Sequence, residues 1–211
     1  MIAYKFLARG AVSPFAGVAW PQPSRGAAGA WVTASSAPGP ELWIHGCRPA
    51  DLPYWVDVEL WRVELSDPAL PVRHEVRADR ARLLRRLEAW DFTSRRDFTL
   101  DCALRIGRFA AEALARDGRD AEARALSACR TLDDLAAAAE ALDAPVPARS
   151  RQLLGYCGDA VFWGRRSHAG CVSYIAAIAA ADLQADPAAL DAERTRQARW
   201  LCDRLGIAPG A

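Results

Sequence analysis

The chain has 211 residues, enough for one large domain or two small ones whose core needs no disulfide or metal. Its 27 basic residues nearly balance 26 acidic ones, so the net charge of +1 creates no global field toward nucleic acid or an anionic membrane. No window approaches the ~18 apolar residues of a membrane span, the N-terminal apolar run is too short for a secretory signal, and the six cysteines form no C-x-x-C pair. We expect a cytoplasmic protein with reduced thiols, no metal site and neither nucleic acid nor a membrane as its partner.

The first 40 residues predict a strand followed by a long loop. Residues 1–7 alternate between two faces as a strand does. Residues 10–40 are rich in glycine and proline and hold three isolated aromatic anchors, Phe15, Trp20 and Trp31. Loops of this length inside a compact domain tend to be functional. We therefore expect an anchored loop that covers part of the fold.

Residues 41–65 predict two strands joined by a crossover. In residues 41–47 the strand period of two places Leu42 and Ile44 on one face. The other face carries Trp43, His45 and Cys47. Residues 59–65 alternate as a half-buried strand. If the two strands are neighbours, Leu42 and Ile44 join its inward side chains in the core, which are Trp61, Val63 and Leu65.

The crossover between these strands brings further aromatic side chains to the same place. Pro49 and Pro53 exclude a long helix, and Asp51 can cap a single turn. That turn carries Leu52, Tyr54 and Trp55 back onto the sheet. An imidazole, a thiol and several aromatic rings thus converge from about twenty residues, which is how small pockets are commonly built.

The apolar period changes after the predicted strands. Residues 72–76 can add a strand, and from Asp79 the spacing becomes helical, with one apolar face formed by Leu83, Leu84, Leu87 and Trp90. The opposite face of that helix would be lined by Arg80, Arg82, Arg85 and Arg86. Glu75, Asp79 and Glu88 interleave with these arginines, and a mixed helix face is usually only solvated. This reading argues against a nucleic-acid partner.

The remainder of the chain is predicted to be helical because its ends are marked by capping residues. Ser94 can cap a helix that runs to about Asp117, and Gly118 stops it. Thr131 caps a second helix. Asp186 caps the last helix, with Pro187 in its first position and Gly206 after its end.

These elements predict an α+β fold. A β-rich part with mixed or antiparallel strands spans residues 1–90, and a helical part spans 91–211. Residues 151–170 are interrupted by glycines, and residues 171–181 read as a helix of small residues suited to close contact. With few linker residues between the parts, we expect them to associate as one unit.

The candidate site residues lie in the β-rich part. His45 is a candidate general acid–base, and Cys47 a candidate nucleophile that the imidazole could activate. Residues i and i+2 of a strand are ~6.5–7 Å apart, so a direct Cys–His contact would require a bend at Gly46. Aromatic faces suit rings and cations, and the ligand-binding candidates are Trp43, Arg48, Tyr54 and Trp55. Trp61 and Trp90 are better explained as core.

Other constellations are weaker. Cys157, Asp159, His168 and Cys171 have the residue types of a metal site, but their spacing matches no zinc pattern. The chain contains no G-x-G-x-x-G, G-x-x-x-x-G-K or G-x-S-x-G, which removes the commonest nucleotide and hydrolase signatures. We expect no cofactor on these grounds.

Several segments in the first 90 residues carry a family resemblance. They are Tyr4-Lys5-Phe6-Leu7, Pro14-Phe15 with Trp20-Pro21, His45-Gly46-Cys47-Arg48-Pro49 with Leu52-Pro53-Tyr54-Trp55, and Glu59-Leu60-Trp61-Arg62-Val63-Glu64-Leu65. Together they resemble a family of bacterial and phage-borne proteins for which no activity is known. That family often reads Gly-Ile-His-Ala-Cys where this chain has Trp43 to Cys47. The resemblance implies a compact fold and draws attention to His45.

A looser likeness involves Tyr4-Lys5, Ile44-His45, Pro53-Tyr54-Trp55 and Glu75. These places are similar to those of ADP-ribosyltransferase-type folds, in which an early Arg or His, an aromatic turn and a later glutamate serve an NAD-dependent reaction. The likeness implies dinucleotide binding near Lys5 and His45, with Glu75 as the glutamate. Lys5 departs from the usual Arg or His, and no glycine follows it.

Three hypotheses follow from these residues. The first is a small-molecule enzyme without a cofactor, such as a lyase or cyclase, with His45 as general acid–base in an aromatic pocket. The second is an ADP-ribosyltransferase-like enzyme that uses NAD. The third is a non-catalytic binding or interaction module whose helices could form a homodimer.

Overall fold

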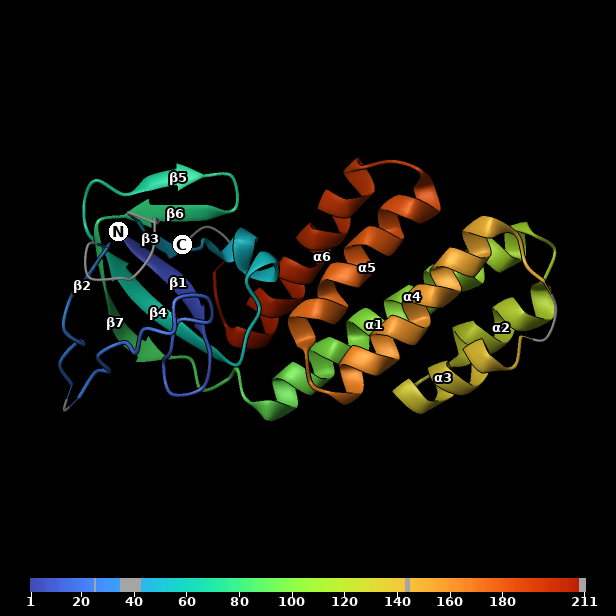
Figure 1. Ribbon diagram of the computed structural model, residues 1–211, viewed down its shortest axis with the longest axis horizontal. Helices are drawn as coiled ribbons and strands as arrows, with labels where there is room; N and C mark the ends of the chain where they lie inside the picture. Colours follow the sequence, from blue (N-terminus) through green and yellow to red (C-terminus); the bar gives the residue numbers. More distant parts are fainter. Residues whose placement is uncertain (25, 35–42, 143–144, 209–211) are drawn as a thin grey trace. The chain divides into compact units, whose positions relative to one another are not determined.

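The structure is a computed structural model that describes residues 1–24, 26–34, 43–142 and 145–208 (Figure 1). The chain divides into two compact units, Met1–Asp91 with Ala198–Ala211, called here the sheet unit, and Phe92–Gln197, the helical unit. The expected α+β class is confirmed, with antiparallel sheets in the first unit and several helices in the second. The return of the last residues to the sheet unit was not expected from sequence. Among the described helices, none is long and apolar enough to cross a membrane.

Two antiparallel sheets build the sheet unit, as far as the described residues show. The β1 sheet has the order β1-β4-β7-β2, formed by β1 (Ile2–Leu7), β4 (Glu59–Leu65), β7 (Arg80–Arg86) and β2 (Val32–Thr33). The β3 sheet has the order β3-β6-β5, formed by β3 (Ile44–Gly46), β6 (Glu75–Ala78) and β5 (Leu70–Val72). A pair of backbone hydrogen bonds between Tyr4 and Cys47, at 2.9 and 2.7 Å, connects β1 to the end of β3.

A buried core contains the inward side chains of both sheets. Ile44 of β3 and Val76 of β6 share it with Trp61, Val63 and Leu65 of β4. The expected contribution of Ile44 to this core is confirmed, although β3 and β4 belong to different sheets and are not hydrogen-bonded neighbours. Leu42 lies outside the described residues. Because alternate residues of a strand face opposite sides, His45 of β3 and Arg62 of β4 point away from this core.

The helix expected from Asp79 is wrong, since residues 80–86 form strand β7. The spacing of Leu83, Leu84 and Leu87 fits a helix, but Ala81 and Leu83 also alternate with arginines at the period of a strand. Pairing with β4 decides between the two, because Val63 then lies opposite Leu83 and Leu65 opposite Ala81. The strand expected at residues 72–76 is instead a hairpin, β5 and β6 joined at residues 73–74.

The N-terminal loop is held by a few buried groups. Trp20 is buried and its indole N–H donates to Ser13 Oγ at 2.8 Å. Phe15 was expected to be a second anchor, and this is wrong because its side chain is 91 % exposed. A Cβ at Gly29 would lie 2.1 Å from the backbone oxygen of Pro21, so the chain crosses itself too closely there for any larger residue.

The helical unit is built around the long helix α1 (Phe92–Arg116), which buries an apolar stripe that includes Phe98, Cys102 and Ile106. The other helices are α2 (Asp120–Ala128), α3 (Leu132–Glu140), α4 (Ala148–Arg165), α5 (Ala169–Gln184) and α6 (Ala188–Leu205), which continues into the sheet unit. The Thr131 cap is confirmed as a capping box with Asp134, and Asp186 accepts from the Ala188 N–H at 2.9 Å. Gly118 and Gly206 follow their helices with positive φ, as expected.

The glycines of residues 151–170 do not break the helix before Arg165, since α4 runs through most of this stretch and α5 begins at Ala169. Gly155 and Gly158 have open space around their Cα atoms, and Gly164 lies against the Leu132 side chain. A helix tolerates such glycines at roughly 1 kcal/mol each when the rest of it makes tertiary contacts. Here α4 makes these tertiary contacts with α1, α3 and α5.

Candidate functional site

His45 faces away from the core of the sheet unit and meets an acid on the neighbouring strand. It lies opposite Arg77 in the register of β3 and β6, and Glu75, two residues before Arg77, shares that face. The distance between His45 Nδ1 and Glu75 Oε2 is 2.7 Å. The side chains are 22 % and 10 % exposed, so the pair is shielded without being sealed. We call His45, Glu75 and Arg77 the His45 cluster.

Glu75 is held as an ion by its two partners. Arg77 Nε donates to Oε1 at 2.5 Å, while His45 occupies Oε2. Burial raises the pKa of Glu75, but the hydrogen bonds from Arg77 and His45 outweigh it and leave this pKa below its ordinary value. A carboxylate next to Nδ1 assigns the proton to that nitrogen.

Lys5 reaches the same cluster from β1. Its Nζ donates to the backbone oxygen of His45 at 2.7 Å and lies 5.2 Å from the centre of the Trp20 ring. The structure thus joins Lys5 to His45 through the His45 backbone, and joins His45 to Glu75 through the imidazole. A cation beside the His45 backbone also fixes the position of β3 relative to β1.

A second histidine lies next to the cluster. Asp51, buried inside the 3₁₀ helix η2 (Pro49–Tyr54), does not cap that helix as expected, since Arg48 occupies the cap position. Its carboxylate accepts from Arg48 Nε at 2.5 Å and lies 3.7 Å from Nδ1 of His74. Arg48 Nη2 also donates to the Arg73 backbone oxygen at 2.6 Å.

Tyr54 and Trp55 also contact His74. The rings of Tyr54 and His74 stack with their centres 3.7 Å apart and an interplanar angle of 11°. The Trp55 indole N–H donates to the His74 backbone oxygen at 2.6 Å. We call Arg48, Asp51, Tyr54, Trp55 and His74 the His74 clamp. Because residues 73–74 form the β5–β6 turn, the clamp sets the position of Glu75, the next residue along the chain.

Two other predicted site residues have different surroundings. Cys47 is 2 % exposed, and burial and the nearby Asp51 carboxylate raise the pKa of its thiol, outweighing the opposite influence of Lys5 and Arg48. That environment disfavours the thiolate a nucleophile needs. Trp43 precedes β3 and is 38 % exposed. No hydrogen bond or ring contact joins Trp43 to the described residues of the His45 cluster.

The sequence reasoning missed His74 and the true partners of Asp51, and it considered Glu75 only through a family likeness. The available signal was the polar stretch Arg73-His74-Glu75 between Val72 and Val76. It predicts a hairpin turn whose polar residues point at a neighbouring strand. The pairing of β3 with β6 that brings Glu75 to His45 spans 30 residues and leaves no local pattern.

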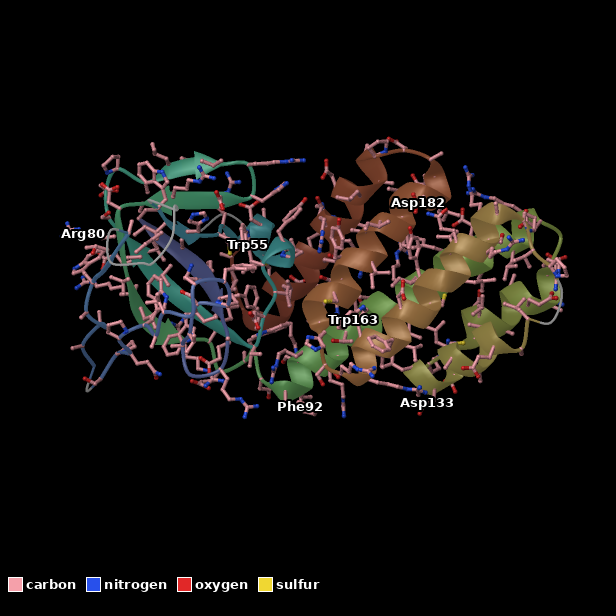
Figure 2. All side chains as sticks on the ribbon, viewed as in Figure 1. Trp55, Arg80, Phe92, Asp133, Trp163 and Asp182 are labelled. Carbon is pink, nitrogen blue, oxygen red and sulfur yellow. The ribbon has the colours of Figure 1, made fainter. Side chains whose placement is uncertain are left out.

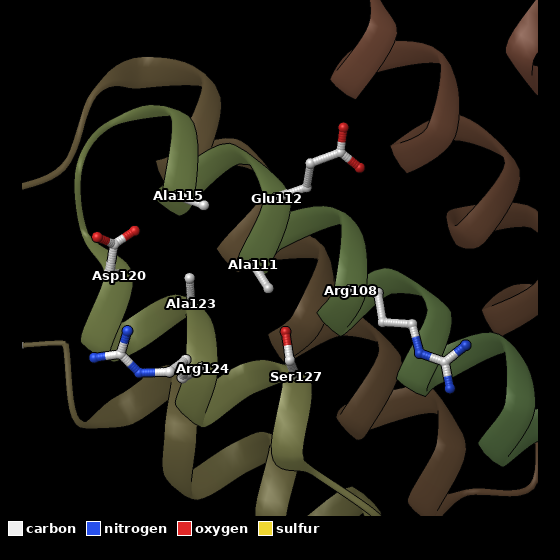
Figure 3. Close-up of a pocket in the computed structure, with 8 residues that line it drawn as sticks. All are labelled: Arg108, Ala111, Glu112, Ala115, Asp120, Ala123, Arg124 and Ser127. Carbon is white, nitrogen blue, oxygen red and sulfur yellow. The ribbon is translucent and has the colours of Figure 1, made fainter.

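A shallow depression of about 290 Å³ lies elsewhere, between α1 and α2 of the helical unit (Figure 3). Its lining consists of small and charged side chains: Arg108, Ala111, Glu112, Ala115, Asp120, Ala123, Arg124 and Ser127. It contains no histidine, cysteine or aromatic ring, so we prefer the His45 cluster as the candidate site. Among the described residues, no group of three or more potential ligands is arranged to hold a metal ion.

Comparison with family models, with curated proteins and with solved structures found no match. Neither resemblance suggested by the sequence therefore gains support.

Proposed function

We propose that the protein is a small-molecule enzyme without a cofactor, in which His45 acts as general acid–base in proton transfer of the lyase or cyclase type. The observation that carries this proposal is the 2.7 Å contact between His45 Nδ1 and the Glu75 carboxylate. A carboxylate in this place orients the imidazole and stabilises the imidazolium that forms when Nε2 takes a proton. General acid–base catalysis of this kind contributes about 10²–10⁴-fold to a rate.

Arg77 and Lys5 support His45 in this role. Arg77 keeps Glu75 ionised by binding its second oxygen, so the acid remains an acceptor when His45 changes its protonation state. Lys5 holds the His45 backbone. Hydrogen bonds from neighbouring residues of this kind hold a functional side chain in the geometry that catalysis requires.

The charges around the cluster indicate the substrate class. The Arg48 and Arg77 side chains are each 38 % exposed although each binds a carboxylate. Their remaining N–H groups suit a carboxylate or phosphate on a small molecule. We therefore propose a small anionic substrate with an acidic C–H bond or a β-leaving group, and Tyr54 or Trp55 as the apolar side of the site.

The test combines a thermal-shift screen of small carboxylates, phosphates and aromatic metabolites with deuterium incorporation into each hit in D₂O. A ligand at 100 times its Kd should stabilise the fold by about 2.7 kcal/mol. We expect His45→Gln to retain binding and to lose deuterium exchange by at least about 100-fold. The control is His168→Gln in the helical unit, which should change neither. Exchange that persists in His45→Gln would contradict the proposal, and binding without exchange in the parent would favour a non-catalytic binding module.

The NAD-using alternative is favoured by one observation, the contacts that join Lys5 to the His45 backbone and Glu75 to its imidazole. These are three of the positions that the ADP-ribosyltransferase likeness implies. This alternative predicts a thermal shift with NAD and slow release of nicotinamide that Glu75→Gln abolishes. If NAD gives no thermal shift while a compound of the small-molecule screen does, the NAD-using alternative is excluded.

A further inference from the structure

Four arginines lie on the outer face of the β1 sheet, one from β4 and three from β7. Trp61, Val63 and Leu65 of β4 point into the core, so Arg62 and Glu64 point outward. Register then places Arg82 opposite Glu64 and, beyond a bulge, Arg85 opposite Arg62. Arg80 precedes Arg82 by two residues and shares its face; it is labelled in Figure 2. Four guanidinium groups against the one carboxylate of Glu64 give this face of the described strands a charge of +3, whereas the whole chain carries +1.

Two of these arginines form a pair of like charges whose repulsion is unfavourable. Arg62 and Arg85 are directly opposite across β4 and β7, and like charges in that relation destabilise a sheet. Arg62 Nε is buried and lacks a hydrogen-bond partner among the described residues. A buried donor from which nothing accepts destabilises the folded state. An anion between the two side chains would remove both penalties.

An aromatic ring extends the same face. Trp31, just before β2, is 37 % exposed and lies beside two guanidinium groups, with Arg82 Cζ 4.7 Å and Arg80 Cζ 5.4 Å from its ring centre. Arg82 also binds Glu64 at 2.7 Å, which holds it beside the ring. A partly exposed aromatic ring beside arginines on a sheet face is suited to a stacked base and the phosphates next to it.

We propose that this face, formed by Arg62, Arg80, Arg82, Arg85 and Trp31, binds single-stranded nucleic acid. From Arg80 to Arg85 the arginines follow β7 for roughly 16 Å at the rise of a strand, which exceeds one phosphate and fits several nucleotides. From sequence alone a nucleic-acid partner was not expected on two grounds, the small net charge of the whole chain and the acids interleaved with arginines on an expected helix face. The strand at residues 80–86 changes the second ground, because Glu75 and Glu88 do not share a face with its arginines. Glu75 lies on the other sheet, where it binds His45 and Arg77, and Glu88 lies beyond the end of β7.

The test measures binding of the full chain to a labelled oligothymidylate or oligouridylate of roughly 12 nucleotides by fluorescence anisotropy. We expect the logarithm of affinity to fall with the logarithm of salt with a slope of about −3, because each phosphate contact with a single strand contributes about −0.7. Arg62→Gln with Arg85→Gln should weaken binding at least about ten-fold and bring the slope to about −1.4. Trp31→Ala should weaken it roughly ten-fold with the slope unchanged.

The matched control removes the same two charges from the helical unit. Arg108 and Arg124 are exposed residues beside the depression of Figure 3, and Arg108→Gln with Arg124→Gln should leave affinity and slope as in the parent. The Arg62 and Arg85 double variant should unfold at the parent temperature or above it, since a repulsive pair is lost. If that variant does not fold, Arg85→Gln alone, at an exposed side chain, serves instead.

Three results would overturn the proposal: no binding at ~50 mM salt, equal loss of affinity in the control, or duplex DNA bound as tightly as the single strand. Polyphosphate that competes equally well while Trp31→Ala has no effect would also overturn it, because the face would then recognise charge alone. None of these results depends on the chemistry proposed for His45.

Discussion

Glu59 and Glu75 are two buried acids of the sheet unit, and they differ in what holds them. Glu59 accepts the backbone N–H groups of Gly10 and Ala11 at 3.0 Å each and the indole N–H of Trp61 at 3.1 Å, with Arg86 at 3.5 Å. Glu75 accepts from two side chains, His45 and Arg77. Burial raises the pKa of both acids, and in both the hydrogen bonds outweigh it and lower that pKa.

The difference separates a structural acid from a candidate site. The donors around Glu59 are mostly backbone groups and an indole that cannot change protonation, and they tie the N-terminal loop to β4. The donors around Glu75 include the imidazole of His45, for which we propose proton transfer. Two carboxylates with similar burial and similar pKa directions therefore support opposite interpretations, because only one can couple to a proton transfer.

Glu59→Ala should produce the largest loss of stability. The substitution leaves the Gly10 and Ala11 N–H groups and the Trp61 indole without an acceptor, and removing one member of such a buried charged group costs about 3–5 kcal/mol. Urea unfolding followed by tryptophan fluorescence measures it. Glu59→Gln, which keeps an acceptor oxygen, should recover part of the loss. A cost below ~1 kcal/mol for Glu59→Ala would mean that the loop is not held by this acid.

Glu75→Ala should cost less, about 1–2 kcal/mol, since Arg77 is partly exposed and can turn to water. We expect the same variant to abolish the deuterium exchange assigned to His45, whereas Glu59→Gln should preserve it. Unfolding and exchange measured on one protein preparation separate the two effects. Equal losses of stability in Glu59→Ala and Glu75→Ala would remove the contrast between the two regions.

Acid should destabilise both regions in the same pH range. A carboxyl whose pKa is lower in the folded state than its ordinary value of 4.5 stabilises the fold above that pH. As pH falls below 4.5, the unfolded chain binds more protons than the folded one, so the free energy of unfolding decreases until the folded pKa is passed. Urea midpoints between pH 3 and 6 should therefore fall less steeply in Glu59→Gln and in Glu75→Gln. A slope like the parent's in Glu75→Gln would show that its pKa is not lowered.

Elements with local signals were predictable from sequence. The alternation of residues 1–7, the Thr131 capping box, the Asp186 cap and the glycines at 118 and 206 act within a few neighbouring residues. Residues 80–86 were not predictable in this way, because their leucines satisfy the helical period and only the register with β4 selects a strand. Tertiary pairing overrode the local preference there.

The candidate site likewise combines residues with a local sequence signal and residues placed only by tertiary pairing. His45 and Ile44 could be assigned to opposite faces from the strand period alone. The partners Glu75 and Arg77 depend on β3 pairing with β6, and the His74 clamp depends on a hairpin turn meeting η2. His45 was thus identified from the strand pattern, whereas Glu75 was named only through the ADP-ribosyltransferase likeness.

His45→Gln should have the smallest effect on stability and the sharpest effect on function. The imidazole is partly exposed, and the amide of glutamine can still donate to Glu75, so we expect a change within about 0.5 kcal/mol. Glutamine cannot accept and return a proton, so exchange into a bound ligand should stop although the ligand still binds. Urea unfolding and deuterium exchange on this variant measure the two quantities. A loss of several kcal/mol would place His45 with Glu59 as a structural group, because residues kept for function commonly contribute little to stability.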